Sequence, residues 1–251
     1  MLPNPDIIFS GIVNRQLRIL PAYFMLIAAN VLPVYGAAIG KLVFFQVLYL
    51  YWFESLLLIL FDFIRILSAR GSEVGESMSY VKVLRSTSED GYVRGFWRKL
   101  GMALSTAVVR ALLLLFYLVF LILFIGFHVT AKGHEMHVME TIVFQDQFFN
   151  TSVIAFIINM LVQLIGVFFI GGQYRKYSPR TYTSFMDVRT IIIHVMLAGS
   201  VFIHQFFFEG KSYEATGEIV YIGLFMLAKT GVDLLQLRGE LSARPAVMPM
   251  I

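Results

Sequence analysis

An acidic residue near the middle of a long apolar run is the feature that most constrains how this chain can fold. The run covers residues 42–67, LVFFQVLYLYWFESLLLILFDFIRIL, and Glu54 lies near its centre. Crossing a bilayer takes roughly 20 apolar residues. A charge at mid-depth costs at least about 2.5 kcal/mol on insertion scales, so it needs a partner or a water-filled cavity. The run therefore predicts a membrane helix with one polar face, on which helical spacing also places Tyr51, Asp62 and Arg65.

The composition extends this conclusion to the whole chain. Of the 251 residues, 58% are hydrophobic and 14% are charged, whereas a soluble domain carries about 25% charged residues. No cysteine is present, which excludes disulfides and thiol chemistry. The N-terminal sequence MLPNPD has no basic segment, so we expect no cleaved signal peptide. The chain is predicted to be an all-α, polytopic protein of the cell (inner or cytoplasmic) membrane. We expect it to contact the lipid bilayer and not to bind nucleic acid.

Six apolar segments account for most of the chain and predict a six-transmembrane-helix bundle in a single domain, 1–251. The predicted spans are about 17–35, 42–67, 102–127, 148–170, 190–208 and 218–236. The loops between them alternate in charge. Those on the side of both termini hold 15 Lys and Arg, and the three opposite loops hold 3. Basic residues mark the cytoplasmic side, so both termini are predicted to be cytoplasmic.

Ionisable residues within these spans form the candidate site. They are Glu54, Asp62, Arg110, His194, Lys229 and Asp233, with Tyr51, Asn159 and Arg189 as supporting residues. Glu54 and Lys229 each lie roughly 16 to 18 Å from the outer ends of their spans, at about 1.5 Å per residue, so we predict that they pair near the midplane. Lys229 can also reach Asp233, one turn away. The residues could form a structural charge network or a functional polar cavity, or the span boundaries could be misplaced.

The loop 128–140, HVTAKGHEMHVME, raises the question of a metal site. Histidine and carboxylate are zinc ligands, and His134 and His137 are the candidate pair. However, HEMH is not the H-E-x-x-H motif, because its two histidines are three residues apart. We therefore expect a solvated loop, with metal binding as the alternative. No phosphate-binding loop or hydrolase motif is present, and the sequence leaves any cofactor unknown.

Three short motifs resemble those of an uncharacterised prokaryotic family of polytopic membrane proteins. They are Tyr51-Trp52-Phe53-Glu54, Arg189 followed by His194, and Lys229-Thr230-Gly231-Val232-Asp233. The chain departs from that family at Ser55, where Asn is usual, at Arg110, in a helix that usually carries His-Tyr-Gly and a further His, and at Gln236, where His is usual. The resemblance implies a shared fold and site position, in a family of unknown function.

The absence of a catalytic motif favours a structural or accessory membrane subunit, within a complex with other membrane proteins. The alternative is a membrane-embedded enzyme or a small-solute or ion carrier that uses the polar cluster. A dry and fully paired cluster would favour the structural role, and a wet cavity reachable from one side would favour the alternative.

Overall fold

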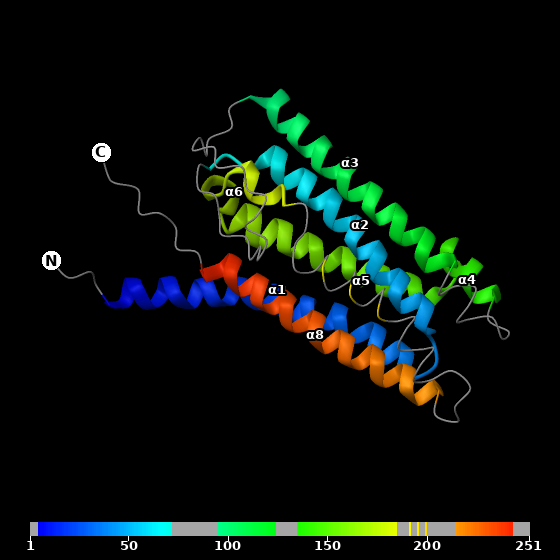
Figure 1. Cartoon of the computed structure of the whole chain (residues 1–251). Helices are drawn as coiled ribbons and strands as arrows, with labels where there is room; N and C mark the ends of the chain where they lie inside the picture. Colours follow the sequence, from blue (N-terminus) through cyan, green and yellow to red (C-terminus); the bar gives the residue numbers. More distant parts are fainter. Residues whose placement is uncertain are drawn as a thin grey trace.

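The computed structural model describes residues 5–71, 95–123, 135–184 and 214–242, with the isolated positions 191, 195 and 199. Helices make up all the regular structure of these ranges, and no β-strand occurs in them (Figure 1). The long helices are α1 (Pro5–Ala38), α2 (Phe44–Ser68), α3 (Phe96–Phe120), α5 (Gln147–Val162) and α8 (Glu214–Ser242). The shorter elements are α4 (Glu135–Ile142), the π-helix η3 (Gln163–Ile170), α6 (Gln173–Lys176) and the 3-10 helix η4 (Pro179–Tyr182). The predicted all-α class is thus confirmed.

Five helices in the described part of the chain are long and apolar enough to cross a membrane. They cover Leu20–Ala38, Phe44–Ser68, Phe96–Leu123, Met139–Ile170 and Ile219–Gly239. Each overlaps a predicted span, although the third begins six residues earlier than the predicted 102 because the helix already starts at Phe96. The predicted span 190–208 lies outside the described residues except at the three isolated positions.

Contacts along α2 fix the directions of its neighbours. Phe44 packs on Tyr221 near the start of α8, and Glu54 contacts Lys229 further along both helices, so α2 and α8 run in the same direction. Aromatic contacts of Tyr49 with Phe149 and of Tyr51 with Phe156 show that α5 runs the same way.

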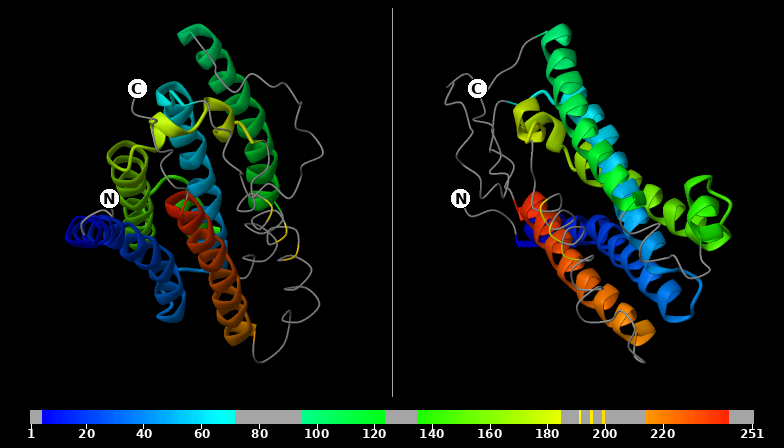
Figure 2. Two further views of the ribbon diagram at one scale, coloured as in Figure 1. Left: turned by 90° about the vertical axis from the view of Figure 1, so that its left-hand side faces the viewer. Right: turned by 45° about the vertical axis from the view of Figure 1, so that its right-hand side comes forward.

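The other two long helices run in the opposite direction. On α3, Leu114 contacts Trp52 and Lys99 contacts Ala69, so α3 is antiparallel to α2. Helix α1 lies beside α8 in Figures 1 and 2. Asn30 on α1 contacts Lys229, and the earlier residues Ala22 and Leu26 share a buried cluster with Leu237, so α1 is antiparallel to α8. One end of the bundle carries α6 (Figure 1). Helices α1 and α3 begin at this end, and helices α2 and α8 finish there.

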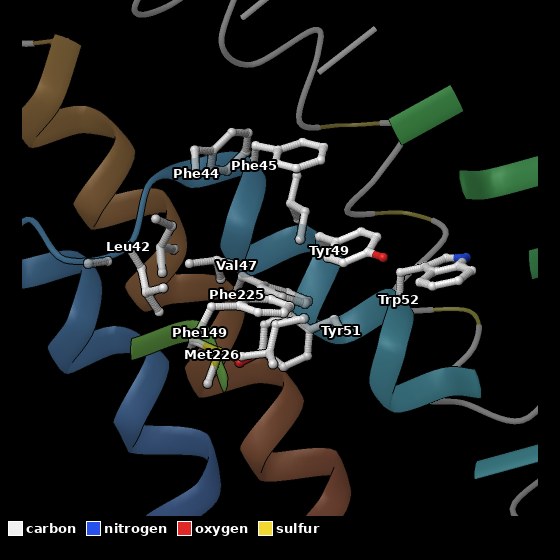
Figure 3. Close-up of a cluster of buried hydrophobic side chains, with 14 of the residues drawn as sticks. Leu42, Phe44, Phe45, Val47, Tyr49, Tyr51, Trp52, Phe149, Phe225 and Met226 are labelled. Atoms are coloured by element: carbon white, nitrogen blue, oxygen red, sulfur yellow. Dashed lines mark hydrogen bonds between the residues drawn. The ribbon is translucent and has the colours of Figure 1, made fainter. Parts of the chain in front are cut away.

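The largest buried cluster fills the opposite half of the bundle with aromatic rings from α2, α5 and α8. Figure 3 shows Tyr51, Phe149, Phe225 and Met226 directed toward one another. The Tyr51 ring meets the Phe225 ring edge-on, with 4.9 Å between their centroids, and its hydroxyl donates to the Met226 sulfur. Burying an aromatic hydroxyl requires such a partner, and edge-to-face ring pairs add about 0.5–1.5 kcal/mol beyond area burial. This packing holds α2 and α8 in register one turn before Glu54.

The segment 128–140, predicted to be a loop, is helical in its second half, where residues 135–142 form α4. The helix ends at a polar contact with α2: the buried Gln46 amide donates to the Thr141 hydroxyl and to the Asp146 carboxylate, each at 3.0 Å. Asp146 in turn caps α5 by accepting from the Phe149 amide at 2.7 Å. A tertiary contact thus stabilises a helix that its local composition does not suggest.

Candidate intramembrane ion network

Four polar side chains from three helices meet in the bundle interior and form what we call the Lys229 network. Its members are Asn30 on α1, Glu54 on α2, and Lys229 and Asp233 on α8, and each is at most 4% exposed. Lys229 and Asp233 share a helix face because they are four residues apart. Since α1 and α2 both pack against that face, Asn30 and Glu54 reach the same ammonium group.

The Lys229 ammonium has an acceptor for each of its three protons. Its Nζ lies 2.9 Å from the Asn30 amide oxygen, 3.0 Å from Glu54 Oε1 and 2.8 Å from Asp233 Oδ2. The Asn30 amide nitrogen also donates to Asp233 Oδ2 at 3.2 Å, so Asn30 bridges the cation and one anion. An ammonium has three donors and no acceptor, so these contacts saturate it.

Two aromatic rings also lie near this cation. The Tyr51 ring centroid is 5.1 Å from Lys229 Nζ, and that of Phe156 on α5 is 5.3 Å away. Ring faces attract cations, and the attraction is stronger in desolvated sites. The network and these two rings therefore connect α1, α2, α5 and α8 around the Lys229 ammonium.

The burial of these charges makes their pairing essential. An isolated ion in a low-dielectric interior is strongly destabilised, whereas close oppositely charged partners offset much of that cost. Ion pairs of 2.8–2.9 Å link Lys229 to both carboxylates. Each member thus helps to stabilise the others inside the bundle. Glu54 and Lys229 are in direct contact, as their matched depths in the sequence predict.

Asp62 and Arg110 belong to a second group, the Arg110 cluster, nearer the end of the bundle that carries α6. Arg110 Nη1 donates to Asp62 Oδ2 at 2.7 Å, and Arg65 pairs with the other Asp62 oxygen at 3.3 Å. The Arg110 guanidinium also donates through Nε to the Ser184 carbonyl at 2.9 Å. The Arg65 guanidinium lies 5.7 Å from the Tyr182 ring centroid. The cluster ties the 177–184 segment to α2 and α3.

The five predicted site residues that the structure describes therefore fall into two groups. Glu54 and Asp62 lie on the same helix but meet different neighbours: α8 at the first position and α3 at the second. Arg110 pairs with Asp62, on the neighbouring helix α2. Depth from the membrane surface cannot distinguish these arrangements, because it does not specify which helices are adjacent.

The supporting residues have different outcomes. Tyr51 contacts the Lys229 network through its ring. Asn159 is buried, but its amide oxygen accepts from Gln163 at 3.0 Å, where α5 changes into the π-helix η3. His194, Arg189 and His134 lie outside the described residues, as does the side chain of His137. Among the described residues, no group of three or more His, Asp or Glu could hold a metal ion.

Asn30 is the network member that sequence reasoning missed. It is a single amide between Ala29 and Val31 in an apolar segment, and it carries no charge to mark it. The available signal is its polarity alone, because a buried amide inside a membrane span requires hydrogen-bond partners.

Comparisons with known proteins agree with the resemblance noted from the motifs. No curated protein and no solved structure matches the chain. A family model does match it, over residues 13–248, which is nearly the whole chain and includes both polar clusters. The chain therefore belongs to a family of unknown function (DUF6498).

Proposed function

We propose that this protein is a six-span protein of the cytoplasmic membrane with both termini in the cytoplasm. The number of spans is supported by the directions of α5 and α8. Both helices run parallel to α2, so α5 with η3 ends at the end of the bundle opposite the start of α8 (Figure 1). The intervening chain has to return across the membrane, which requires one more span, and 190–208 is the apolar segment available for it.

The orientation predicts which positions react from outside the cell. In this cysteine-free chain, single cysteines replacing Tyr80 or Lys176 should resist a membrane-impermeant thiol reagent in intact cells, and a cysteine replacing Lys132 should react. The reason is the excess of basic residues on the loops that hold the first two positions. Labelling after membrane permeabilisation controls for accessibility. Reaction of the Tyr80 or Lys176 variant in intact cells would contradict the orientation.

Within that membrane, we propose that the protein is a structural or accessory subunit and that the Lys229 network holds its helices together. The observation that carries this proposal is the saturated ammonium: three acceptors at 2.8–3.0 Å surround Lys229, which is 1% exposed. A carrier or acid–base catalyst needs a group that exchanges protons or ligands with water. An ammonium whose donors are all engaged by buried side chains is suited to joining helices.

The surface of α3 is consistent with a subunit that contacts lipid or other membrane proteins. Only Ala103 and Leu114 of this helix are buried. Many of its other large apolar side chains are exposed, including Leu112 at 62% and Phe116 at 66%. Such a surface is stable in hydrocarbon and leaves α3 free to pack on the spans of a neighbouring protein.

The reactivity of Glu54 distinguishes the structural role from the carrier role. A hydrophobic carbodiimide modifies membrane carboxyl groups that take up a proton, and the buried ion pair of Glu54 with Lys229 should leave Glu54 unmodified. The protein is treated in native membranes between about pH 6 and 8, and peptide mass spectrometry reads modification at residue 54. The Glu54→Gln variant serves as the control for site assignment. Modification of Glu54 that an added cation or solute suppresses would overturn the structural role and favour a carrier.

A further inference from the structure

A basic and aromatic patch lies at the end of the bundle where α2 ends, α3 begins and α6 follows η3. Three described segments of this end, 66–71, 95–101 and 171–184, together contain six basic residues and no acidic one. The basic residues are Arg70, Arg98, Lys99, Arg175, Lys176 and Arg180. We call this group the cationic end.

Direct contacts hold the three segments of the cationic end together. The Lys99 ammonium donates to the carbonyl of Ala69 at 2.5 Å, and the backbone amide of Arg70 donates to the carbonyl of Tyr174 at 2.6 Å. Gly71 lies so close to Lys176 that a Cβ at position 71 would overlap the Lys176 carbonyl group. The positive charges are therefore gathered by the fold, and Arg70 is close enough to Lys99 to repel it.

Four of these six charges are not paired with a carboxylate in the described part of the chain. Arg70, Arg98, Lys99 and Arg175 form no ion pair with any described residue. Like charges held together raise the electrostatic energy, which a bound anion lowers. The side chains of Arg70 and Arg98 are exposed and make no hydrogen bond to a described residue, so they are available to such an anion.

Exposed aromatic rings set the depth of the cationic end in the membrane. Phe96 and Trp97, at the start of α3, are 58% and 79% exposed. They directly precede Arg98 and Lys99 in the sequence. Tryptophan next to basic residues at the end of an apolar span is typical of the headgroup level of a bilayer. The anion available at this depth is the phosphate of a lipid.

We propose that the cationic end binds the headgroup of an anionic phospholipid. Arg70, Arg98 and Lys99 surround the phosphate, while Trp97 lies at the level of the glycerol backbone. Basic residues near an anionic surface each strengthen binding by about five-fold. This site is separate from the Lys229 network, so it stands even if the structural role of that network is wrong.

The test compares lipid binding by the purified full-length protein and its variants in detergent micelles. Native mass spectrometry and melting temperature report binding of phosphatidylglycerol, with phosphatidylcholine as the neutral lipid. We expect Arg70→Gln/Arg98→Gln to bind phosphatidylglycerol about 25-fold more weakly than the parent. The control Lys41→Gln removes an exposed charge at the opposite end of the bundle and should bind like the parent. High salt should reduce parent binding of phosphatidylglycerol.

A second set of measurements distinguishes a lipid site from a site for a soluble anion. The charge-retaining variant Arg70→Lys/Arg98→Lys should keep most of the phosphatidylglycerol binding. In phosphatidylcholine, all variants should have the same melting temperature as the parent. If the Lys variant loses lipid as the Gln variant does, charge is not the cause and the proposal fails. Equal phosphatidylglycerol binding by the Gln variant and the parent would also overturn it. If inorganic phosphate raises the melting temperature as much as the lipid does, the site binds a soluble anion and the lipid proposal is wrong.

Discussion

Replacing Lys229 by Met is expected to produce the largest loss of stability of any single change in the described part of the chain. Methionine keeps much of the length of the side chain but leaves the Glu54 and Asp233 carboxylates, 3% and 2% exposed, without the ammonium between them. Removing one partner of a buried ion pair typically costs about 3–5 kcal/mol. The free energy of unfolding in detergent, from denaturant titration of the parent and variant, measures the effect.

Two comparisons make this prediction specific. Lys41→Met removes an exposed lysine in the turn before α2 and should leave the free energy of unfolding unchanged. Asn30→Ala removes a neutral hydrogen-bonding group and should cost less than Lys229→Met, about 1–3 kcal/mol. A Lys229→Met protein as stable as the parent would show that its carboxylates have other sufficient partners.

Replacing Arg110 by Met is expected to have the second-largest effect and to act on one segment. The change removes the 2.7 Å ion pair with Asp62 and the hydrogen bonds to the Ser184 carbonyl. Asp62 keeps Arg65 at 3.3 Å, so its carboxylate is not stranded. Hydrogen bonds to charged groups contribute about 1.5–3 kcal/mol, which sets the expected loss. Hydrogen–deuterium exchange should rise in 177–184, whose anchor to α3 is lost.

The control for that experiment is Arg98→Gln, which removes an exposed arginine from the same helix without breaking a hydrogen bond to a described residue. It should leave exchange in 177–184 at the parent level. Arg110→Lys retains the charge, but its ammonium cannot replace the several N–H donors of the planar guanidinium. It should therefore restore only part of the protection of 177–184 from exchange. Exchange in 177–184 that is equal in Arg110→Met and the parent would contradict the proposed anchoring.

Hydropathy predicts the long helices well because membrane solvation forces each apolar segment of sufficient length into one element. The contact between Glu54 and Lys229 follows from the same reasoning, since two opposite charges at one depth have few alternatives. The boundary of α3 is predicted less accurately: Gly95 and the aromatic and basic residues after it suggest an interface, yet the helix already begins at Phe96.

Sequence reasoning cannot predict which helices lie next to one another in the bundle. Depth alone does not identify the partner of Arg110, which is Asp62, because the antiparallel packing of α3 on α2 decides that contact. Asn30 and Gln46 escape notice since an uncharged amide gives little signal until its neighbours are known. Helix α4 is missed for a related reason, because it is stabilised by a contact between Thr141 and Gln46, which are 95 residues apart in the sequence.

A double-mutant cycle on Glu54 and Lys229 tests the central claim most directly. The free energy of unfolding is measured for the parent, Glu54→Gln, Lys229→Met and the double variant. If the two residues share one buried interaction, the double variant should lose less than the sum of the single losses, by about 0.5–3 kcal/mol. The double variant should also recover part of the stability that Lys229→Met loses, since one stranded carboxylate is gone. Strictly additive losses would mean that Glu54 and Lys229 do not stabilise each other and would contradict a structural ion network.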